Sequence, residues 1–457
     1  MPSFAADKLA AWTGGRWTRI PDGSLAGFTQ DTRQLAAGQV FVALKTDRRD
    51  GHDFMEEARG RQAVAAIVAR EIAASSLPQL VVPDPLVAFQ RIAREHRREF
   101  HGAVVGVTGS VGKTSTKDLL ALLLGGQTSV LATEGNLNNH LGVPLTLTKI
   151  DPDQLRAAVI EAGISGPGEM APLAEMIEPD NAVVTLVAPA HLEKLGTVDG
   201  VAEEKALLLA AVRPGGRQVF PASCLAFAPF RALAHPLVLV PENEGMTRIA
   251  GRSVRFNLFH RPDRTEITLD GRRRFILRRV SSGMAQNAAL ALVLAGELGV
   301  ADADLQARAE SWQPSKWRGE LRQLGEAIAY CDFYNANPAS MADAIDAFNH
   351  SVPSDRPRLY VLGCMEELGA AAAEYHQQLG RTMHLRRGDF VFALGDQAAA
   401  LREGLLENGN DPAQVAVIAD LAPVRERLAG FAGAVFLKGS RRYQLETVLD
   451  RSLVGAH

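Results

Sequence analysis

The chain has 457 residues, and its 49 Lys and Arg against 52 Asp and Glu give a formal net charge of −3. Hydrophobic residues make up 47% and charged residues 22%, a composition typical of globular proteins that argues against a disordered or fibrous chain. The balanced charge argues against a nucleic-acid partner, and no apolar run reaches the roughly 18 residues that cross a bilayer.

The length predicts three domains, each large enough to bury its own core. The first residues lack a basic segment followed by an apolar stretch, so no secretory signal is visible. The cysteines Cys224, Cys331 and Cys364 are too few and too scattered for a disulfide frame or a zinc site. We therefore expect a cytoplasmic monomer without membrane insertion.

Short buried strands are expected at Val40–Leu44 and Ala65–Val68, followed by a helix from Pro85 to about Phe100. Buried strands then alternate with helical stretches, which is the pattern of a parallel sheet with crossover helices. The strands expected in this second region are Ala103–Val107, Ala157–Ile160 and Val183–Val187.

Residues from about 251 to 280 alternate like antiparallel strands at the edge of that sheet, and Ala285–Leu298 is helix-like. Apolar strands that end in polar or glycine-rich turns then predict a second open α/β sheet. These strands are Ala327–Tyr330, Leu359–Leu362, Val391–Leu394 and Val435–Leu437.

The segment TGSVGKTS (108–115) has the composition of a phosphate-binding loop. It lies between a predicted strand and a helix whose apolar side includes Leu119, Leu120 and Leu123. In that setting, backbone N–H groups face phosphate oxygens, Lys113 supplies a cation and a hydroxyl ligates Mg²⁺. A turn that only caps a helix would not need Gly-Lys-Thr directly after a strand. The loop predicts a nucleotide site without choosing among ATPase, kinase, GTPase and ligase.

Glu161 and His191 follow buried strands of the same predicted sheet. The carboxyl ends of parallel strands converge on one crevice, and the phosphate loop opens at that edge. A carboxylate and an imidazole are suitable neighbours there for Mg²⁺ and phosphate.

Three other features have a structural explanation beside a functional one. By composition Lys205 is a solvated helix lysine, and Asp332–Pro338 is a turn in which Asp and Asn bond their own backbone. Alternatively, Asp332–Pro338 forms a second polar edge facing the nucleotide. Lys438–Arg441 resembles an anion-binding turn, a common pattern that is weak by itself.

Six segments together resemble the Mur ligase family, and the opening segment 31–54 is similar to the family's UDP-sugar domain. The resemblance covers nearly the whole chain and is strongest for the branch that adds D-Ala-D-Ala. The six segments are TGSVGKTS (108–115), EGNLNNHLGVPLTL (134–147), EAGISGPGEM (161–170), APAHLEKLGTVDGVAEEKA (188–206), YNANPASM (334–341) and LKGSR (437–441).

The resemblance implies an α/β protein with three domains. These are a small α/β UDP-sugar-binding domain (1–100), a central parallel-sheet ATP-binding domain with the phosphate loop (101–310) and a Rossmann-like ligase domain (311–457). It implies an ATP- and Mg²⁺-dependent ligase of peptidoglycan precursor synthesis. Such an enzyme joins D-Ala-D-Ala to the terminal carboxylate of UDP-MurNAc-tripeptide through an acyl phosphate.

The resemblance also implies residue roles. Lys113 would contact the ATP phosphates, Thr114 and Glu161 would hold a first Mg²⁺, His191 would lie at a second metal, and Lys205 would be carbamylated. Further nucleotide contacts are implied for Gly109, Ser110, Gly112, Ser115, Asn287, Arg318, Asp332, Asn335 and Asn337. Contacts near UDP-MurNAc are implied for Asp31, Arg33, Asn136, Asn138 and Asn139, and the candidate partners of the D-Ala-D-Ala carboxylate are Lys438, Ser440 and Arg441.

The chain departs from the family pattern at a few positions. Gly283 and Met284 replace a His-Asn pair ahead of Asn287. Cys331 replaces the first Asp of a pair, with Phe333 in place of a Ser, and Cys364 replaces an Asp in a glycine-flanked turn.

Other functions remain open at this point. One is a related ligase that adds a diamino acid, or a folate polyglutamate ligase. Another is a nucleotide-gated binding module without ligase activity, which would not need Glu161, His191 and Lys205 together.

Overall fold

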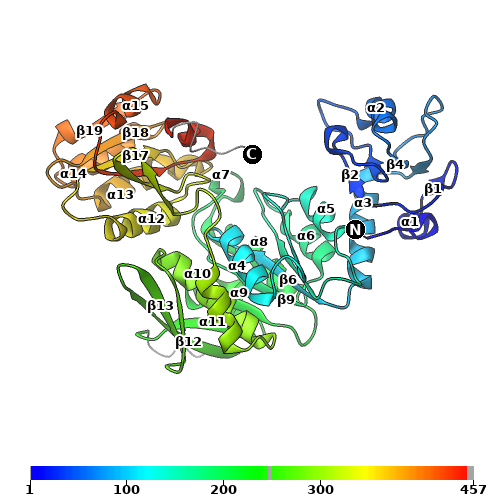
Figure 1. Cartoon of the computed structure of the whole chain (residues 1–457), viewed down its shortest axis with the longest axis horizontal. Coiled ribbons are helices and arrows are strands. Elements are labelled where there is room, and N and C mark those ends of the chain that lie inside the picture. The colour runs from blue at the N-terminus through cyan, green and yellow to red at the C-terminus, as the bar shows by residue number, and fades with distance from the viewer. Residues whose placement is uncertain (1, 245–249, 450–457) are drawn as a thin grey trace.

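The chain builds three separate β-sheets that follow one another along the sequence, as Figure 1 shows. The computed structural model describes residues 2–244 and 250–449. We call the parts that carry the sheets the N-terminal, central and C-terminal units. The N-terminal and C-terminal units lie on opposite sides of the central unit (Figure 1). The predicted α/β class is confirmed.

The N-terminal unit has a five-stranded sheet in the order β1-β5-β4-β3-β2, with only the β1–β5 pair antiparallel. The strands predicted near residues 40 and 65 are confirmed, although the first ends at Val42. Asp84 begins the predicted helix, because its carboxylate accepts hydrogen bonds from the N–H groups of Leu86 and Val87. The elements are α1 (Ala6–Thr13), β1 (Arg16–Trp17), β2 (Phe28–Thr29), β3 (Val40–Val42), α2 (Met55–Gly60), β4 (Ala65–Val68), β5 (Gln79–Val81) and α3 (Pro85–Glu99).

The central unit has a nine-stranded sheet in the order β14-β13-β12-β11-β10-β9-β6-β8-β7. The strands from β7 to β12 are parallel, whereas β12, β13 and β14 form the predicted antiparallel edge. The elements are β6 (Ala103–Thr108), α4 (Lys113–Leu124), β7 (Val130–Ala132), α5 (Gly142–Leu147), β8 (Ala157–Glu161), α6 (Met170–Ile177), β9 (Asn181–Val184), α7 (Leu192–Leu195), α8 (Val198–Ala210), β10 (Gln218–Pro221), α9 (Ala228–Arg231), β11 (Pro236–Pro241), β12 (Arg252–His260), β13 (Arg264–Leu269), β14 (Arg273–Arg278), α10 (Ser282–Glu297) and α11 (Asp302–Ser311).

Two predicted boundaries in this unit are wrong. The strand expected at Val183–Val187 ends at Val184, for a reason that lies in the site described below. The helix expected from Ala285 starts at Ser282, because the Ser281 hydroxyl accepts a hydrogen bond from the N–H of Met284 and caps it.

The C-terminal unit has a six-stranded sheet in the order β15-β16-β20-β17-β18-β19, and only β15 is antiparallel. The four predicted strands are confirmed as β16, β17, β18 and β20, whereas β15 and β19 were not predicted. The elements are β15 (Glu320–Leu324), β16 (Ala327–Cys331), α12 (Pro338–Ser351), β17 (Arg358–Gly363), α13 (Ala372–Thr382), β18 (Phe390–Leu394), α14 (Ala398–Glu407), β19 (Val415–Ile418), α15 (Ala422–Leu428) and β20 (Ala434–Lys438).

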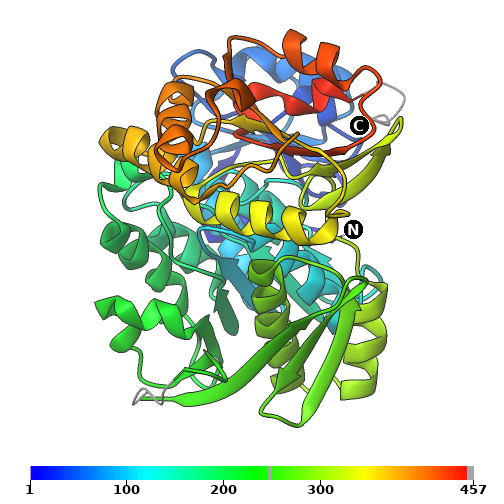
Figure 2. The same cartoon turned by 90° about the vertical axis from the view of Figure 1, so that its left-hand side faces the viewer.

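Figure 2 shows α12 between the C-terminal sheet and the central unit.

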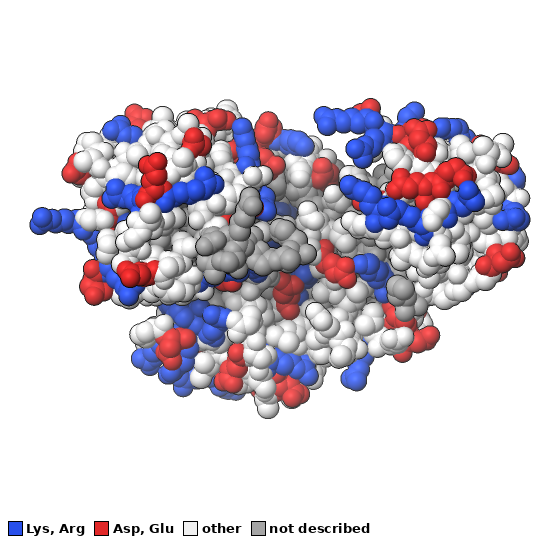
Figure 3. All heavy atoms as spheres, turned by 45° about the horizontal axis from the view of Figure 1, so that its top comes forward, with Lys and Arg blue, Asp and Glu red and all other residues white. Residues whose placement is uncertain are grey.

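The distribution of surface charge and the lengths of the helices agree with the expectations from the composition. Acidic and basic side chains are interspersed over the face in Figure 3. Within residues 2–244 and 250–449, no helix is long and apolar enough to cross a membrane.

A buried arginine joins the N-terminal helix α3 to the central unit. The Arg97 side chain is fully buried and donates to the carbonyl oxygens of Ile177, Phe100 and Glu178 at 3.0, 3.2 and 2.9 Å. It also donates to the Asp180 carboxylate at 2.8 Å. One guanidinium therefore satisfies three carbonyls and a charge at the turn that precedes β9.

We expect Arg97→Leu to lower the free energy of unfolding by about 3–5 kcal/mol, because it removes the donor shared by three carbonyls and the main ion-pair partner of Asp180, which keeps only the Val104 N–H and a 3.4 Å contact with Arg213. Urea unfolding followed by circular dichroism measures the loss. The matched control is Arg98→Leu, which removes a half-exposed ion pair with Glu178 and should cost less than about 1 kcal/mol. Equal losses in the two variants would contradict the role of Arg97.

Candidate active site

The phosphate loop joins β6 to α4, and two of its glycines are required by the geometry. Gly109 and Gly112 have φ values of +150° and +81°, which side chains rarely adopt. A Cβ at Gly109 would lie 1.9 Å from Thr185 Oγ1, and one at Gly112 would lie 2.0 Å from Asn287 Nδ2. The loop is therefore packed directly against two polar side chains of the central unit.

The residues that follow β9 hold this loop and explain why the strand ends early. The Ser110 N–H donates to Leu186 O at 2.8 Å, and the Ser110 hydroxyl exchanges hydrogen bonds with Ala188. The Thr185 hydroxyl donates to Val111 O at 2.5 Å. The Thr185 N–H still donates to Thr108 O at the end of β6, but the Thr185 hydroxyl, Leu186 and Ala188 bond to the loop, so regular strand pairing stops here.

A cavity of about 350 Å³ lies beside the loop, between the central and C-terminal units. It brings together most of the predicted site residues, although they come from segments as far apart as 110 and 438. The predicted residues that line it are Ser110, Gly112, Lys113, Thr114, Ser115, Asn138, Asn139, Glu161, His191, Asn287, Arg318, Asp332, Asn335, Asn337 and Lys438.

Two cations lie at the phosphate loop. Lys113 Nζ donates to Gly109 O at 2.9 Å, and burial lowers the pKa of Lys113, an effect that the nearby Glu161 opposes. Arg318 donates to Thr114 Oγ1 at 3.0 Å and lies 4.1 Å above the Tyr334 ring. Both cations can reach a bound phosphate chain.

Glu161 ends β8 and offers one free oxygen to the cavity. Its N–H donates to Thr133 Oγ1 at 2.9 Å, and its Oε1 accepts from Asn138 Nδ2 at 2.8 Å. Its Oε2 is buried without a hydrogen-bond partner. Such an atom is costly unless a cation or a donor meets it, so the site fits a metal ion at this oxygen.

His191 lies at the start of α7 in a left-handed conformation, with a φ of +54°. Its Nδ1 is bonded to the carboxylate of Glu367, which follows β17 in the C-terminal unit. The Glu367 side chain was not predicted as part of the site. Glu367 comes four residues after the end of β17 and next to Glu366, so the rule that identified Glu161, a carboxylate directly after a buried strand, does not select it.

Lys205 is buried in α8, so the interpretation of this residue as a solvated lysine is wrong. Burial lowers the pKa of Lys205 well below its usual range, and the positive charge of Lys113 lowers it further. Among the described residues, its ammonium has no hydrogen-bond or ion-pair partner. Lys205 is not part of the cavity lining, although it lies close enough to Lys113 to be affected by its charge.

The C-terminal unit contributes a paired lysine and a helix-capping asparagine to the cavity. Lys438 Nζ is bonded to Asp332 Oδ2 at 2.7 Å and to Asn335 O at 3.2 Å. Asn337 caps α12 and also donates to Ser110 O at 3.2 Å, so it connects this unit to the phosphate loop.

Several predicted residues lie outside the cavity lining. Asp31 and Arg33 form an ion pair at 2.7 Å in the N-terminal unit, and Asn136 is exposed. Arg441 is paired with Glu446 and lies over Trp317, and Gly109 and Ser440 are also outside the lining.

Two predicted residues are engaged within the protein. Asn139 lines the cavity, but its Oδ1 caps α5 by accepting from Gly142 N at 2.9 Å. Lys438 is fully occupied by Asp332 and the carbonyl of Asn335, so it has no free charge for a substrate carboxylate.

The departures from the family pattern have packing explanations. The Gly283 N–H donates to Asp343 Oδ1 at 2.8 Å, and a Cβ at this glycine would lie 2.7 Å from Asp343 Oδ2. Cys331 and Cys364 are buried, which raises the pKa of their thiols to about 12 and about 11. Both cysteines are therefore neutral packing residues.

The cavity offers few side chains that could bind a metal ion, as is common at a magnesium site where nucleotide phosphates supply the other ligands. Among residues 2–244 and 250–449, no group of three or more His, Cys, Asp and Glu is placed to hold a metal ion. Magnesium is commonly bound through one or two carboxylates together with substrate phosphates. Glu161 and the hydroxyl of Thr114 fit that arrangement.

Comparison with known proteins decides the family. The Mur ligase middle domain matches residues 107–272, and the Mur ligase, glutamate ligase domain matches residues 317–441. UDP-N-acetylmuramoyl-tripeptide–D-alanyl-D-alanine ligase of Escherichia coli is 31% identical over 435 residues, which cover 94% of both chains. The chain belongs to the Mur ligase family.

Solved Mur ligases share the whole fold. MurF from Acinetobacter baumannii matches with a TM-score of 0.85 and 27% identity over 98% of each chain. MurF from Thermotoga maritima in complex with ADP matches with a TM-score of 0.77 and 28% identity, covering 93% of this chain and 96% of that one. The three-sheet architecture of this Mur ligase is therefore that of the family.

Because Gly112 has a positive φ and faces Asn287, we expect Gly112→Ala to weaken ADP binding at least about tenfold, since strain of this kind costs about 1–3 kcal/mol. Isothermal titration calorimetry with ADP measures the change. The matched control is Gly126→Ala, at the end of α4, where φ is +73° and a Cβ would have no other atom within 4 Å. A Gly112→Ala protein that binds ADP as the control does would show that the loop tolerates a side chain.

Proposed function

We propose that this Mur ligase joins D-Ala-D-Ala to the terminal carboxylate of UDP-MurNAc-tripeptide with ATP, in peptidoglycan precursor synthesis. The observation that carries the proposal is the similarity along the whole chain to UDP-N-acetylmuramoyl-tripeptide–D-alanyl-D-alanine ligases, together with a cavity in which the phosphate loop meets Glu161 and His191. A binding module would not need a free buried carboxylate oxygen beside that loop.

The reaction has two steps. A carboxylate oxygen of the tripeptide attacks the γ-phosphorus of ATP, and ADP leaves. The amine of D-Ala-D-Ala then attacks the acyl carbon, phosphate leaves, and the nitrogen loses a proton. Activation is needed because a carboxylate is a poor acyl donor until one of its oxygens becomes part of a leaving group.

The residues of the cavity are suited to the first step, in which charge develops on the transferring phosphoryl group. Lys113 would exchange its hydrogen bond to Gly109 O for one to a phosphate oxygen, and Arg318 lies beside Lys113. Thr114 and Glu161 would hold Mg²⁺, with His191 at a second ion. Magnesium supplies further positive charge to the phosphoryl oxygens.

We propose that Lys205 is carbamylated. The shift of its pKa leaves a larger fraction of neutral amine, whose nitrogen forms a bond to the carbon of CO₂ while a proton is released. The product is an anion in place of a cation. By its match to the family position, the carbamate would add a carboxylate-like oxygen to the metal site.

We also propose that the three units are domains with limits near residues 100 and 310, because the central sheet begins at Ala103 and the C-terminal sheet at Glu320. The N-terminal unit, with Asp31, Arg33 and the nearby Asn136, would bind UDP-MurNAc. The enzyme would act as a cytoplasmic monomer, since one chain supplies the whole cavity and its nucleotide substrates occur in the cytoplasm.

A substrate matrix tests the function. We expect phosphate release to be fast with UDP-MurNAc-tripeptide and D-Ala-D-Ala, at least about tenfold slower with D-Ala, and absent with Lys or diaminopimelate. The expectation rests on the similar ligases, whose names specify D-alanyl-D-alanine as the added group. Faster turnover of UDP-MurNAc-dipeptide with a diamino acid would assign the chain to the neighbouring branch of the family.

The carbamate has its own test. Lys205→Ala should keep less than about 1% of the rate, on the scale of losing one charge-stabilising group, and short carboxylic acids should restore part of it by filling the vacated space. The matched control is Lys117→Ala, which removes another buried lysine, bonded to Thr133 O at 2.6 Å.

Carboxylic acids should not restore the Lys117→Ala variant. In ¹³C-bicarbonate, the wild-type protein should also show a carbamate resonance that Lys205→Ala lacks. An active Lys205→Ala protein, or a wild type without that resonance, would contradict the assignment.

A further inference from the structure

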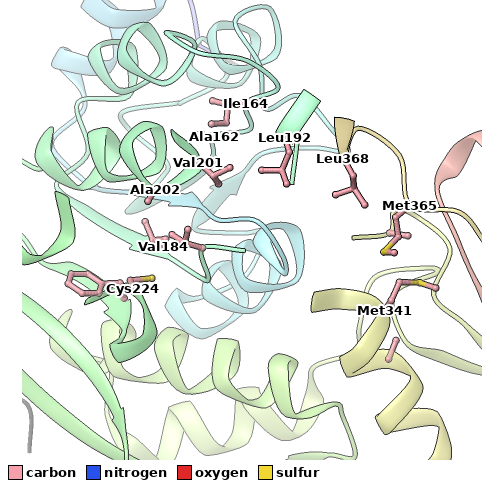
Figure 4. Packing of buried hydrophobic residues seen from close by; sticks show 14 of the residues in the cluster. Ala162, Ile164, Val184, Leu192, Val201, Ala202, Cys224, Met341, Met365 and Leu368 are labelled. Atoms are coloured by element: carbon pink, nitrogen blue, oxygen red, sulfur yellow. The ribbon is translucent and has the colours of Figure 1, made fainter. Parts of the chain in front are cut away.

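The loop that follows β17 packs on α7 of the central unit. The Glu193 N–H donates to Glu367 O at 3.1 Å, and a Cβ at Gly369 would lie 3.1 Å from Glu193 Cα. Figure 4 shows Leu192 of α7 opposite Leu368, with Met365 beyond it. All three apolar side chains are buried in one cluster, so the loop is held against α7.

This packing places one carboxylate against one imidazole. Glu367 has a φ of +63° and His191 a φ of +54°, a conformation that costs a residue with a side chain roughly 1 kcal/mol or more. The two side chains meet, and Nδ1 of His191 is bonded to the Glu367 carboxylate. Two strained residues from different units therefore face each other, and one of them, His191, lines the cavity.

The bond determines which nitrogen of the ring is available. When Nδ1–H donates to a carboxylate, Nε2 keeps its lone pair. Among the described residues, Nε2 of His191 has no hydrogen-bond partner, and His191 lines the cavity that holds the free Glu161 oxygen. The neighbouring Glu366 is directed elsewhere, to Tyr443 and Arg442 within the C-terminal unit.

We infer that Glu367 is a positioning residue for His191 and that its carboxylate fixes the imidazole with Nε2 toward the cavity. Because Glu367 belongs to the C-terminal unit, docking of that unit on α7 completes the orientation of a central-unit ligand. Cation affinity at His191 is thereby coupled to the arrangement of the two units. The inference rests on the proposed role of His191 at a metal.

The test compares Glu367→Ala and Glu367→Gln with Glu366→Ala. The Mg²⁺ concentration that gives half-maximal ADP binding is measured by calorimetry, and the tautomer of His191 by ¹⁵N NMR of histidine-labelled protein, with His191→Gln to assign the signal. We expect Glu367→Ala to raise the half-maximal Mg²⁺ concentration about 10- to 100-fold, the usual effect of losing such a partner. Glu367→Gln, which keeps a neutral acceptor, should give a smaller increase.

The His191 signal should show the Nδ1–H form in the wild type and a mixture of tautomers in Glu367→Ala. Glu366→Ala should change neither measurement. Folded Glu367 variants with wild-type Mg²⁺ dependence and an unchanged His191 signal would overturn the inference. Both measurements use only ADP and Mg²⁺, so they are independent of the substrate matrix, whose failure would instead overturn the proposed function.

Discussion

The hydrogen bonds that fix the phosphate loop are the interactions on which the rest of the site depends. Residues 185–188 hold the loop from the central unit, and Asn337 and Arg318 bond to it from beyond that sheet. The loop is thus preorganised before any nucleotide binds, so little ordering entropy is lost on binding. The same contacts tie the position of the C-terminal unit to the loop.

The charged side chains of the cavity are only partly paired with one another. Lys438 is neutralised by Asp332, whereas Lys113 and Arg318 bond only to neutral oxygens and face outward to the cavity. Glu161 keeps one oxygen free. The site therefore combines positive charge for phosphates with a carboxylate for a cation, which is the distribution that phosphoryl transfer requires.

The connection between the central and C-terminal units is anchored on both sides. Ser315 donates to the Asp118 carboxylate on α4, and Trp317 lies 5.4 Å from Phe333 and under Arg441. Phe333 and Cys331, which depart from the family pattern, are therefore part of the packing around this connection.

The resemblance to the Mur ligases pointed to about half of the residues that line the cavity. The sequence by itself determined the fold class and the phosphate loop. Such features depend on local patterns, since strand periodicity and the Gly-Lys-Thr spacing act within a few residues. It also indicated Glu161 and His191, because polar residues after parallel strands must meet at one edge.

Only the tertiary structure decided what those side chains contact. The burial of Lys205, the pairing of Lys438 with Asp332 and the contact of Glu367 with His191 join segments that lie far apart in the chain. The early end of β9 has the same origin, because residues 185–188 bond to the phosphate loop. Such contacts depend on how the units pack together, and no local pattern of residues encodes that packing.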